Sequence, residues 1–246
     1  MTLFVFAHGL GGFDEIPLPG YPIRYFRDLA PELARAGLRA LFTTVSNFQD
    51  VEGRARDLAR QLDGVAAERI VLVGSSMGGL DARYLACHLD PLRRVKAVIT
   101  VGTPHRGSPI ADATMAGGGL VALLGRTVWG HAIAALTTDA CRAFNAQVPD
   151  RPDVAYGSYG GVRPVAEIPL LLRPWAEVIQ AVAGDNDGLV PLASSVWGTH
   201  RGTLRADHFE TIGWNLGRTD PATARPFDHL SLYMGLARDL AKDLAG

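Results

Sequence analysis

The chain has 246 residues, of which 48% are hydrophobic, and its 25 acidic and 24 basic residues leave a formal net charge of −1. This length is normal for a single-domain α/β enzyme and is sufficient to bury a full core. The near balance of charge, without a basic run, argues against a nucleic-acid partner. Apolar stretches also stay shorter than a membrane span, so we expect no transmembrane segment.

The first residues show no charged n-region, apolar h-region or cleavage site, and a core strand is predicted almost at Met1. As given, the chain is therefore expected to be cytoplasmic. A chain trimmed of its signal peptide would look the same, and the protein would then be secreted. Cys87 and Cys141 lack metal spacing, and a disulfide between them has no support in the sequence, so Cys87 is expected to be a buried free thiol.

Taken in chain order, short apolar runs alternate with amphipathic segments. Strands are predicted at residues 3–7, 38–45, 70–73, 95–101 and 154–159. Helices are predicted at 21–36, with Pro31 interrupting, and at 51–62, 77–89 and 226–244. The pattern of the segment 174–180 fits either a helix or a strand. The alternation predicts one α/β domain over residues 1–246, with a mostly parallel sheet and helices on both faces.

The alternation stops at Pro109. Residues 109–148 are rich in Ala, Gly and Leu and predict one or two helices inserted outside the sheet pattern. They could be simple helical decoration of the domain. The functional alternative is a lid, a mobile cover over an apolar site.

One strand-to-helix junction matches the G-x-S-x-G pattern at Gly74-Ser75-Ser76-Met77-Gly78. This context is typical of a nucleophile elbow, in which Ser76 projects above the carboxyl edge of the sheet. The alternative is an ordinary tight junction. The first strand ends in a glycine-rich loop at residues 8–14, which either aims a backbone N–H at a reaction centre or is a simple strand exit.

A serine nucleophile needs a base within hydrogen-bond reach, and the base needs a carboxylate that fixes its tautomer. In this kind of fold the chain order is serine, acid, histidine, which Ser76, Asp187 and His208 satisfy. Asp185 competes with Asp187 as the acid, and His229 competes with His208 as the base. The other histidines precede the nucleophile, shape a loop or carry no motif: His8, His88, His105, His131 and His200.

These blocks together resemble the true lipases of bacteria, both the pseudomonad and the thermoalkalophilic bacillus types. The resemblance rests on His8-Gly-Leu-Gly-Gly-Phe-Asp14, residues 74–84, Val101-Gly-Thr-Pro-His-Arg-Gly107, Leu136-Thr-Thr138, Phe144-Asn145, residues 186–190 and Asp207-His208. The blocks follow the family's order and cover most of residues 4–245. The resemblance implies an α/β-hydrolase fold with a helical lid at about 109–148, and hydrolysis of carboxyl esters of lipids.

By motif position, the resemblance makes Ser76 the nucleophile, Asp187 the acid and His208 the base. It assigns the oxyanion hole to the backbone N–H groups of Leu10 and Met77. The chemistry would need no cofactor. The substrate would be a lipid or another ester, with transient contact to a lipid interface through the lid. A polyester depolymerase, a short-chain carboxylesterase and a catalytically silent binding module remain alternatives on the same scaffold.

The chain departs from the family pattern in three places. Ser75 stands where these lipases usually have histidine, and the pseudomonad disulfide has no counterpart. Many relatives bind a structural calcium near the catalytic histidine. Glu210 matches one ligand of that calcium, whereas Asn215 offers only a neutral oxygen at the next, so calcium at Glu210 and Asn215 is a candidate to be tested.

Overall fold

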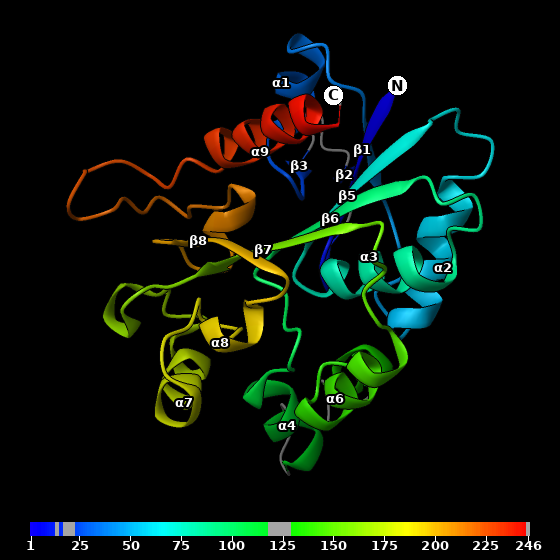
Figure 1. Cartoon of the computed structure of the whole chain (residues 1–246). Helices are drawn as coiled ribbons and strands as arrows, with labels where there is room; N and C mark the ends of the chain where they lie inside the picture. Colours follow the sequence, from blue (N-terminus) through cyan, green and yellow to red (C-terminus); the bar gives the residue numbers. More distant parts are fainter. Residues whose placement is uncertain (13–14, 17–22, 118–128, 245–246) are drawn as a thin grey trace.

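A six-stranded parallel sheet forms the centre of the molecule, in the strand order β4-β1-β5-β6-β7-β8 (Figure 1). The computed structural model describes residues 1–12, 15–16, 23–117 and 129–244. The strands are β1 (Thr2–Ala7), β4 (Ala40–Thr43), β5 (Arg69–Ser75), β6 (Val95–Val101), β7 (Ala155–Gly161) and β8 (Thr199–Leu204). The predicted α/β class and parallel sheet are therefore confirmed.

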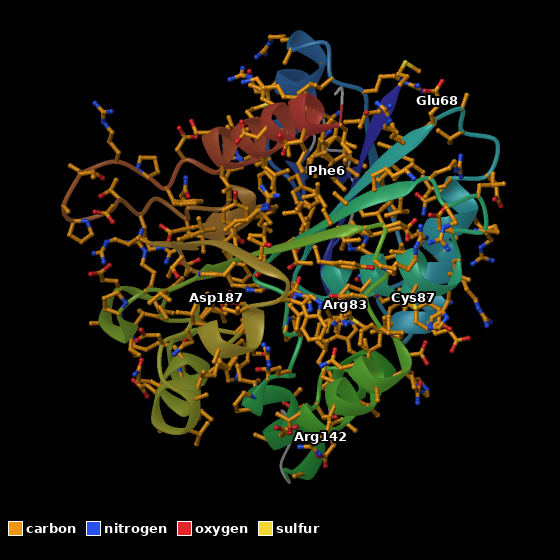
Figure 2. The ribbon with its side chains drawn as sticks, in the orientation of Figure 1. Phe6, Glu68, Arg83, Cys87, Arg142 and Asp187 are labelled. Carbon is orange, nitrogen blue, oxygen red and sulfur yellow. The ribbon has the colours of Figure 1, made fainter. Side chains whose placement is uncertain are left out.

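Helices cover both faces of this sheet (Figure 1). On one face lie α1 (Leu29–Arg35) and α9 (His229–Asp243), and on the other lie α2 (Val51–Gln61) and α3 (Met77–His88). Successive strand residues point to opposite faces. Phe6, labelled in Figure 2, packs on Tyr233 of α9, with ring centroids 6.1 Å apart. Its neighbour Val5 joins the core under α2 and α3.

The predicted helix over 21–36 is shorter than expected. Residues 23–24 instead form β3 (Ile23–Arg24), which pairs antiparallel with β2 (Glu15–Ile16), and α1 begins only at Leu29. Residues 21–22 lie outside the described chain. Pro31 does not interrupt the helix, because it falls in the first turn, where a missing N–H leaves no intrahelical bond unmade.

The remaining segments complete the molecule around the carboxyl ends of the strands. The ambiguous segment 174–180 is helical, within α7 (Arg173–Ala183). Three short helices also lie here: η1 (Val165–Glu167) follows β7, α8 (Leu192–Ser195) follows the loop that contains Asp187, and η2 (Glu210–Ile212) follows His208. Both cysteines are free, and Cys87 is half-buried rather than buried because it lies at the flank of the buried face of α3.

The insertion after β6 contains α4 (Pro109–Ala116) and α6 (Thr138–Gln147), which contact each other beyond the sheet (Figure 1). Residues 118–128 of the expected lid lie outside the described residues. None of the helices in the described ranges combines the length and the hydrophobicity needed to span a bilayer.

Candidate active site

Ser76 occupies the sharp turn between β5 and α3. Its backbone has φ 53° and ψ −131°, a conformation that L-residues rarely adopt and that stores strain. The neighbouring glycines permit this turn. A Cβ at Gly78 would lie 2.3 Å from the carbonyl oxygen of Ala7, and a Cβ at Gly74 would lie 2.4 Å from Cα of Gly79. The elbow is thus pressed against the end of β1.

The glycine-rich loop after β1 lies directly against the serine. A Cβ at Gly9 would be 2.6 Å from the Cβ of Ser76 and 3.1 Å from its Oγ. Leu10 follows Gly9, and Met77 supplies the first amide of α3, where N–H groups lack intrahelical acceptors. The two backbone N–H groups expected to stabilise an oxyanion therefore belong to segments that meet at Ser76.

His8 holds the glycine-rich loop in place. Its Nδ1 lies 2.8 Å from the carbonyl oxygen of Gly9, and its Nε2 accepts a hydrogen bond of 3.1 Å from the Val45 amide. Burial lowers the pKa of His8 to about 4, and the nearby Arg54 charge acts in the same direction. The ring is therefore neutral at pH 7, with Nδ1–H as donor and Nε2 as acceptor.

Asp187 and His208 form a buried hydrogen-bonded pair. His208 Nδ1 lies 2.7 Å from Oδ2 of Asp187, and the His208 amide donates to the Asp187 carbonyl oxygen at 2.8 Å. The other carboxylate oxygen, Oδ1, accepts bonds from the amides of Leu189 and Val190, at 3.0 and 2.7 Å. An ionised carboxylate only accepts, so the proton sits on Nδ1 of His208, and Nε2 is left as a base.

Opposing effects set the pKa of His208. Burial lowers it, but the charge and hydrogen bond of Asp187 raise it, and the net shift is upward.

The elbow and the acid–base pair flank the same peptide at the end of β6. The Ser76 amide donates to the Val101 carbonyl oxygen at 2.9 Å. At the next residue, Gly102, a Cβ would lie 3.1 Å from Oδ2 of Asp187 and 3.4 Å from Nδ1 of His208. Three segments far apart in the sequence thus converge at one sheet edge, where open α/β sheets place their sites.

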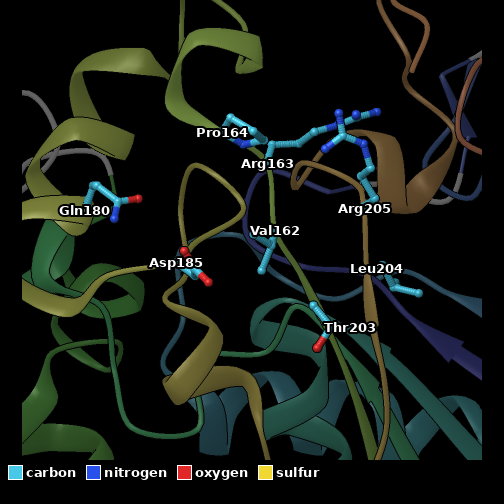
Figure 3. Close-up of a pocket in the computed structure, with 8 residues that line it drawn as sticks. All are labelled: Val162, Arg163, Pro164, Gln180, Asp185, Thr203, Leu204 and Arg205. Carbon is cyan, nitrogen blue, oxygen red and sulfur yellow. The ribbon is translucent and has the colours of Figure 1, made fainter. Parts of the chain in front are cut away.

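The two competing residues lie elsewhere. Asp185 lines a separate hollow of about 480 Å³ beside the ends of β7 and β8, shown in Figure 3. His229 begins α9, its Nε2 lies 2.7 Å from the carbonyl oxygen of Arg27, and burial lowers its pKa. The structure therefore brings Asp187 and His208 together, and not Asp185 or His229.

Tyr25 is a neighbour of the elbow that sequence reasoning missed. Its hydroxyl lies 3.3 Å from Oγ of Ser75, and a Cβ at Gly9 would come within 2.8 Å of it. Ser75 is therefore part of a buried hydroxyl pair behind the glycine-rich loop. Its position before the nucleophile was visible in the sequence, but its partner, fifty residues away, carries no motif.

The Gly-Thr-Pro-His block after β6 is part of a buried cluster that connects the sheet to α6. Arg83 of α3, labelled in Figure 2, lies between the sheet and α6. Its guanidinium carbon is 3.7 Å from the centre of the Trp197 ring. It donates to Asn145 Oδ1 at 2.8 Å, and Asn145 Nδ2 donates to the His105 carbonyl oxygen at 2.8 Å. Burial, aided by the Arg83 charge, lowers the pKa of His105 well below its usual value. This cluster fastens the insertion to the site edge.

The residues suggested for calcium do not fit a calcium site. Both carboxylate oxygens of Glu210 accept from Arg163, at 2.9 Å from Nε and 3.0 Å from Nη2. Asn215 Oδ1 is buried and has no hydrogen-bond partner, but one neutral oxygen cannot satisfy an ion that takes six to eight oxygens. Across the described ranges, no three His, Cys, Asp or Glu side chains gather as a metal site.

Comparisons with known proteins place the chain among lipases. No protein-family model matches it. It is 32% identical to triacylglycerol lipase 2 of Saccharomyces cerevisiae over 89% of this chain and 74% of the relative. It is 30% identical to a triacylglycerol lipase of Pseudomonas fragi over 95% of this chain and 94% of the relative.

Solved structures agree in fold. The Bacillus licheniformis lipase BlEst2 in its mature form matches with a TM-score of 0.72 and 25% identity, over 95% of this chain and 91% of that one. A metagenomic carboxyl esterase, MGS0156, matches with a TM-score of 0.80 and 21% identity, over 98% and 76%.

Proposed function

Because the chain belongs to the bacterial lipase family and has the α/β-hydrolase fold, we propose that it hydrolyses carboxyl esters of lipids through an acyl-enzyme on Ser76. Family membership makes it a carboxylic ester hydrolase of the lipase and esterase type. The observation that carries the catalytic assignment is the Asp187–His208 hydrogen bond at 2.7 Å, on the same peptide edge as the elbow of Ser76.

The proposed reaction follows from these contacts. Ser76 Oγ attacks the ester carbonyl while Nε2 of His208 takes its proton. Asp187 stabilises the imidazolium, and the N–H groups of Leu10 and Met77 hold the negative oxygen of the tetrahedral intermediate. The imidazolium then gives its proton to the leaving alcohol. Water, activated by the same base, cleaves the acyl-enzyme, releases the acid and restores the serine.

A direct test replaces the nucleophile. Ser76→Ala should lower kcat on a soluble ester by several orders of magnitude while the protein folds normally, because oxyanion stabilisation and binding alone remain. A fluorophosphonate probe should label the parent and spare this variant. The matched control is Ser75→Ala, which should keep most activity. Near-normal turnover by Ser76→Ala would overturn the assignment, and a parent that takes up no probe would favour a silent binding module.

We further propose that residues 109–148 act as a lid that meets a lipid interface. Two contacts in the described part support a connection between this insertion and the site. Ser108, which caps α4, donates from its Oγ to the Leu189 carbonyl oxygen at 2.7 Å, two residues from Asp187. Cys141 of α6 is buried against Met77 and Leu80 of the elbow helix.

Substrate chain length distinguishes a lipase from a short-chain esterase. Rates on p-nitrophenyl esters of rising chain length should increase sharply above the solubility limit of the substrate if a lid opens at an interface. A rate that saturates below that limit, with preference for short acyl chains, would favour an esterase without interfacial opening. The measurement is initial rate against concentration across the solubility limit.

A further inference from the structure

Arg163 connects the two loops that carry the acid and the base. It follows β7, and its side chain is only 3% exposed. Its backbone amide donates to the carbonyl oxygen of Asn186 at 3.1 Å, and Asn186 directly precedes Asp187. The main chain of Arg163 is therefore fixed to the acid loop.

The side chain of Arg163 reaches the base loop. Its guanidinium donates two parallel bonds to the Glu210 carboxylate, at 2.9 and 3.0 Å, and Glu210 lies two residues after His208 and is fully buried. Glu210 in turn accepts from the amide of Asp207 at 2.9 Å. A two-bond pair of this kind fixes orientation as well as distance, because both groups are planar.

A second set of carboxylates surrounds the same guanidinium. Arg163 Nη1 donates to Glu167 and Asp220, at 3.1 Å each. Arg205 donates to the same two acids, but it is half exposed and, among the described residues, its guanidinium bonds these acids and not Glu210. Figure 3 shows the two arginine side chains pointing toward one another beside the hollow. Arg163 thus contacts both the loop of Asp187 and the loop of His208, whereas Arg205 shares with it only the carboxylates of Glu167 and Asp220.

We propose that Arg163 is a positioning residue that holds His208 against Asp187, and that its guanidinium supplies the fixed positive charge for which the family resemblance suggested calcium. The inference rests on the proposed function for its meaning. Its support is geometric, since Glu210 has no oxygen left free of the guanidinium and one residue joins both loops. Arg163 itself does not touch the substrate.

The test compares Arg163→Met with Arg205→Met, which removes a guanidinium from the same cluster. Loosening the base loop should lower kcat of Arg163→Met on a soluble ester by about 10- to 100-fold and leave KM within about threefold, because misplacement by an ångström affects the reaction more than binding. Arg205→Met should keep both constants. Arg163→Lys should fall between, since an ammonium cannot hold both oxygens of Glu210.

A spectroscopic readout separates positioning from general weakening. The Nδ1 proton of His208, which lies in the 2.7 Å hydrogen bond to Asp187, should give a low-field proton resonance in the parent. It should broaden or vanish in folded Arg163→Met and persist in Arg205→Met. This readout needs no turnover. An inactive parent would therefore refute the proposed function, while the resonance would still decide the role of Arg163.

A double variant covers the case in which Arg163→Met does not fold. Arg163→Met with Glu210→Gln leaves no unpaired buried charge and keeps an acceptor for the Asp207 amide, so the melting temperature should recover. The value of kcat should stay low and the resonance weak. Full recovery of kcat would overturn the proposal, because charge balance alone would then suffice. A chelator that lowers the melting temperature of the parent would overturn the replacement of calcium.

Discussion

Asp187 determines which way the pKa of the base moves. His208 is almost fully enclosed, and burial by itself lowers the pKa of an imidazole because the charged form loses hydration. The adjacent carboxylate reverses that shift, so the pKa of His208 lies above 6.5. In the proposed reaction only the neutral ring can accept the proton of Ser76, so we expect the rate to fall as pH drops through this raised value.

The first prediction at this scale concerns Asp187→Asn. The amide cannot balance the imidazolium and allows the wrong ring tautomer, so kcat should fall by roughly 10⁴-fold. The acid limb of kcat/KM should also move to lower pH, because burial then acts on His208 without its opposing carboxylate. The measurement is a pH profile of kcat/KM on a soluble ester.

The matched control is Asp185→Asn, two residues away in the same turn, where the side chain faces the hollow. It should keep both the rate and the acid limb of the parent. If Asp185→Asn loses activity while Asp187→Asn does not, the 2.7 Å pair is not the catalytic one.

At the scale of elements, sequence pattern predicted best where one local signal decided the outcome. The apolar runs of β5 and β6 identify buried strands, and the small residues of the elbow identify the tight turn from β5 into α3. The helix predicted over 21–36 forms only from Leu29, because residues 23–24 pair with β2 and local spacing does not report that tertiary contact. The segment α7 stayed ambiguous because apolar spacing over seven residues fits a helix or a strand.

The site divides in the same way. The order of Ser76, Asp187 and His208 can be read from turns at strand ends. Arg163 and Tyr25 could not be found, because their partners are 47 and 50 residues away and a lone Arg or Tyr carries no motif. Sequence pattern therefore points to the proposed catalytic residues more readily than to the residues that pack around them.

A buried ion pair joins α2 to α3 beside the site. Arg54 and Asp81 are both fully buried, and Arg54 Nε donates to Oδ2 of Asp81 at 2.8 Å. The same guanidinium donates to the His8 carbonyl oxygen at 2.7 Å. Burial raises the pKa of Asp81 to about 6 although Arg54 opposes the shift. This pair therefore fixes the helices and the glycine-rich loop as one unit.

The second prediction tests that pair by a double-mutant cycle. Arg54→Met should lower the free energy of unfolding by about 3–5 kcal/mol, because it strands a buried carboxylate. Arg54→Met with Asp81→Leu should cost less than the single change, since no buried charge remains. Urea unfolding at pH 7 measures both.

An exposed arginine of the same helix gives the comparison. Arg56 pairs with Glu52 on the surface of α2, so Arg56→Met should cost only about 0.3–0.5 kcal/mol. A double variant as unstable as Arg54→Met would show that lost packing, and not the stranded charge, dominates.

For the whole molecule, buried histidines contribute to the change of stability with pH. His8, His105 and His229 all have pKa values lowered by burial. Between those values and the ordinary 6.5, the unfolded chain binds more protons than the folded one, so each histidine reduces stability as pH falls. Groups with raised pKa values, Asp81 and Asp207, act in the opposite direction over the acid range. The net slope mixes both, and a difference between variants isolates one group.

The last prediction isolates His8, whose pKa of about 4 allows a magnitude. Its linkage should remove about 2 kcal/mol of stability from the parent between pH 7 and pH 5, because protonation in that range occurs in the unfolded state alone.

His8→Gln keeps an acceptor for the Val45 amide but does not titrate. The substitution itself will lower the free energy of unfolding by an amount that does not depend on pH. Because Gln does not titrate, the free energy of unfolding of the variant should fall less than that of the parent over the same interval. Urea unfolding of both proteins at pH 7, 6 and 5 measures this difference. Two parallel curves would mean that His8 has the same pKa folded and unfolded, and the neutral ring could not then be what fixes the loop beside Ser76.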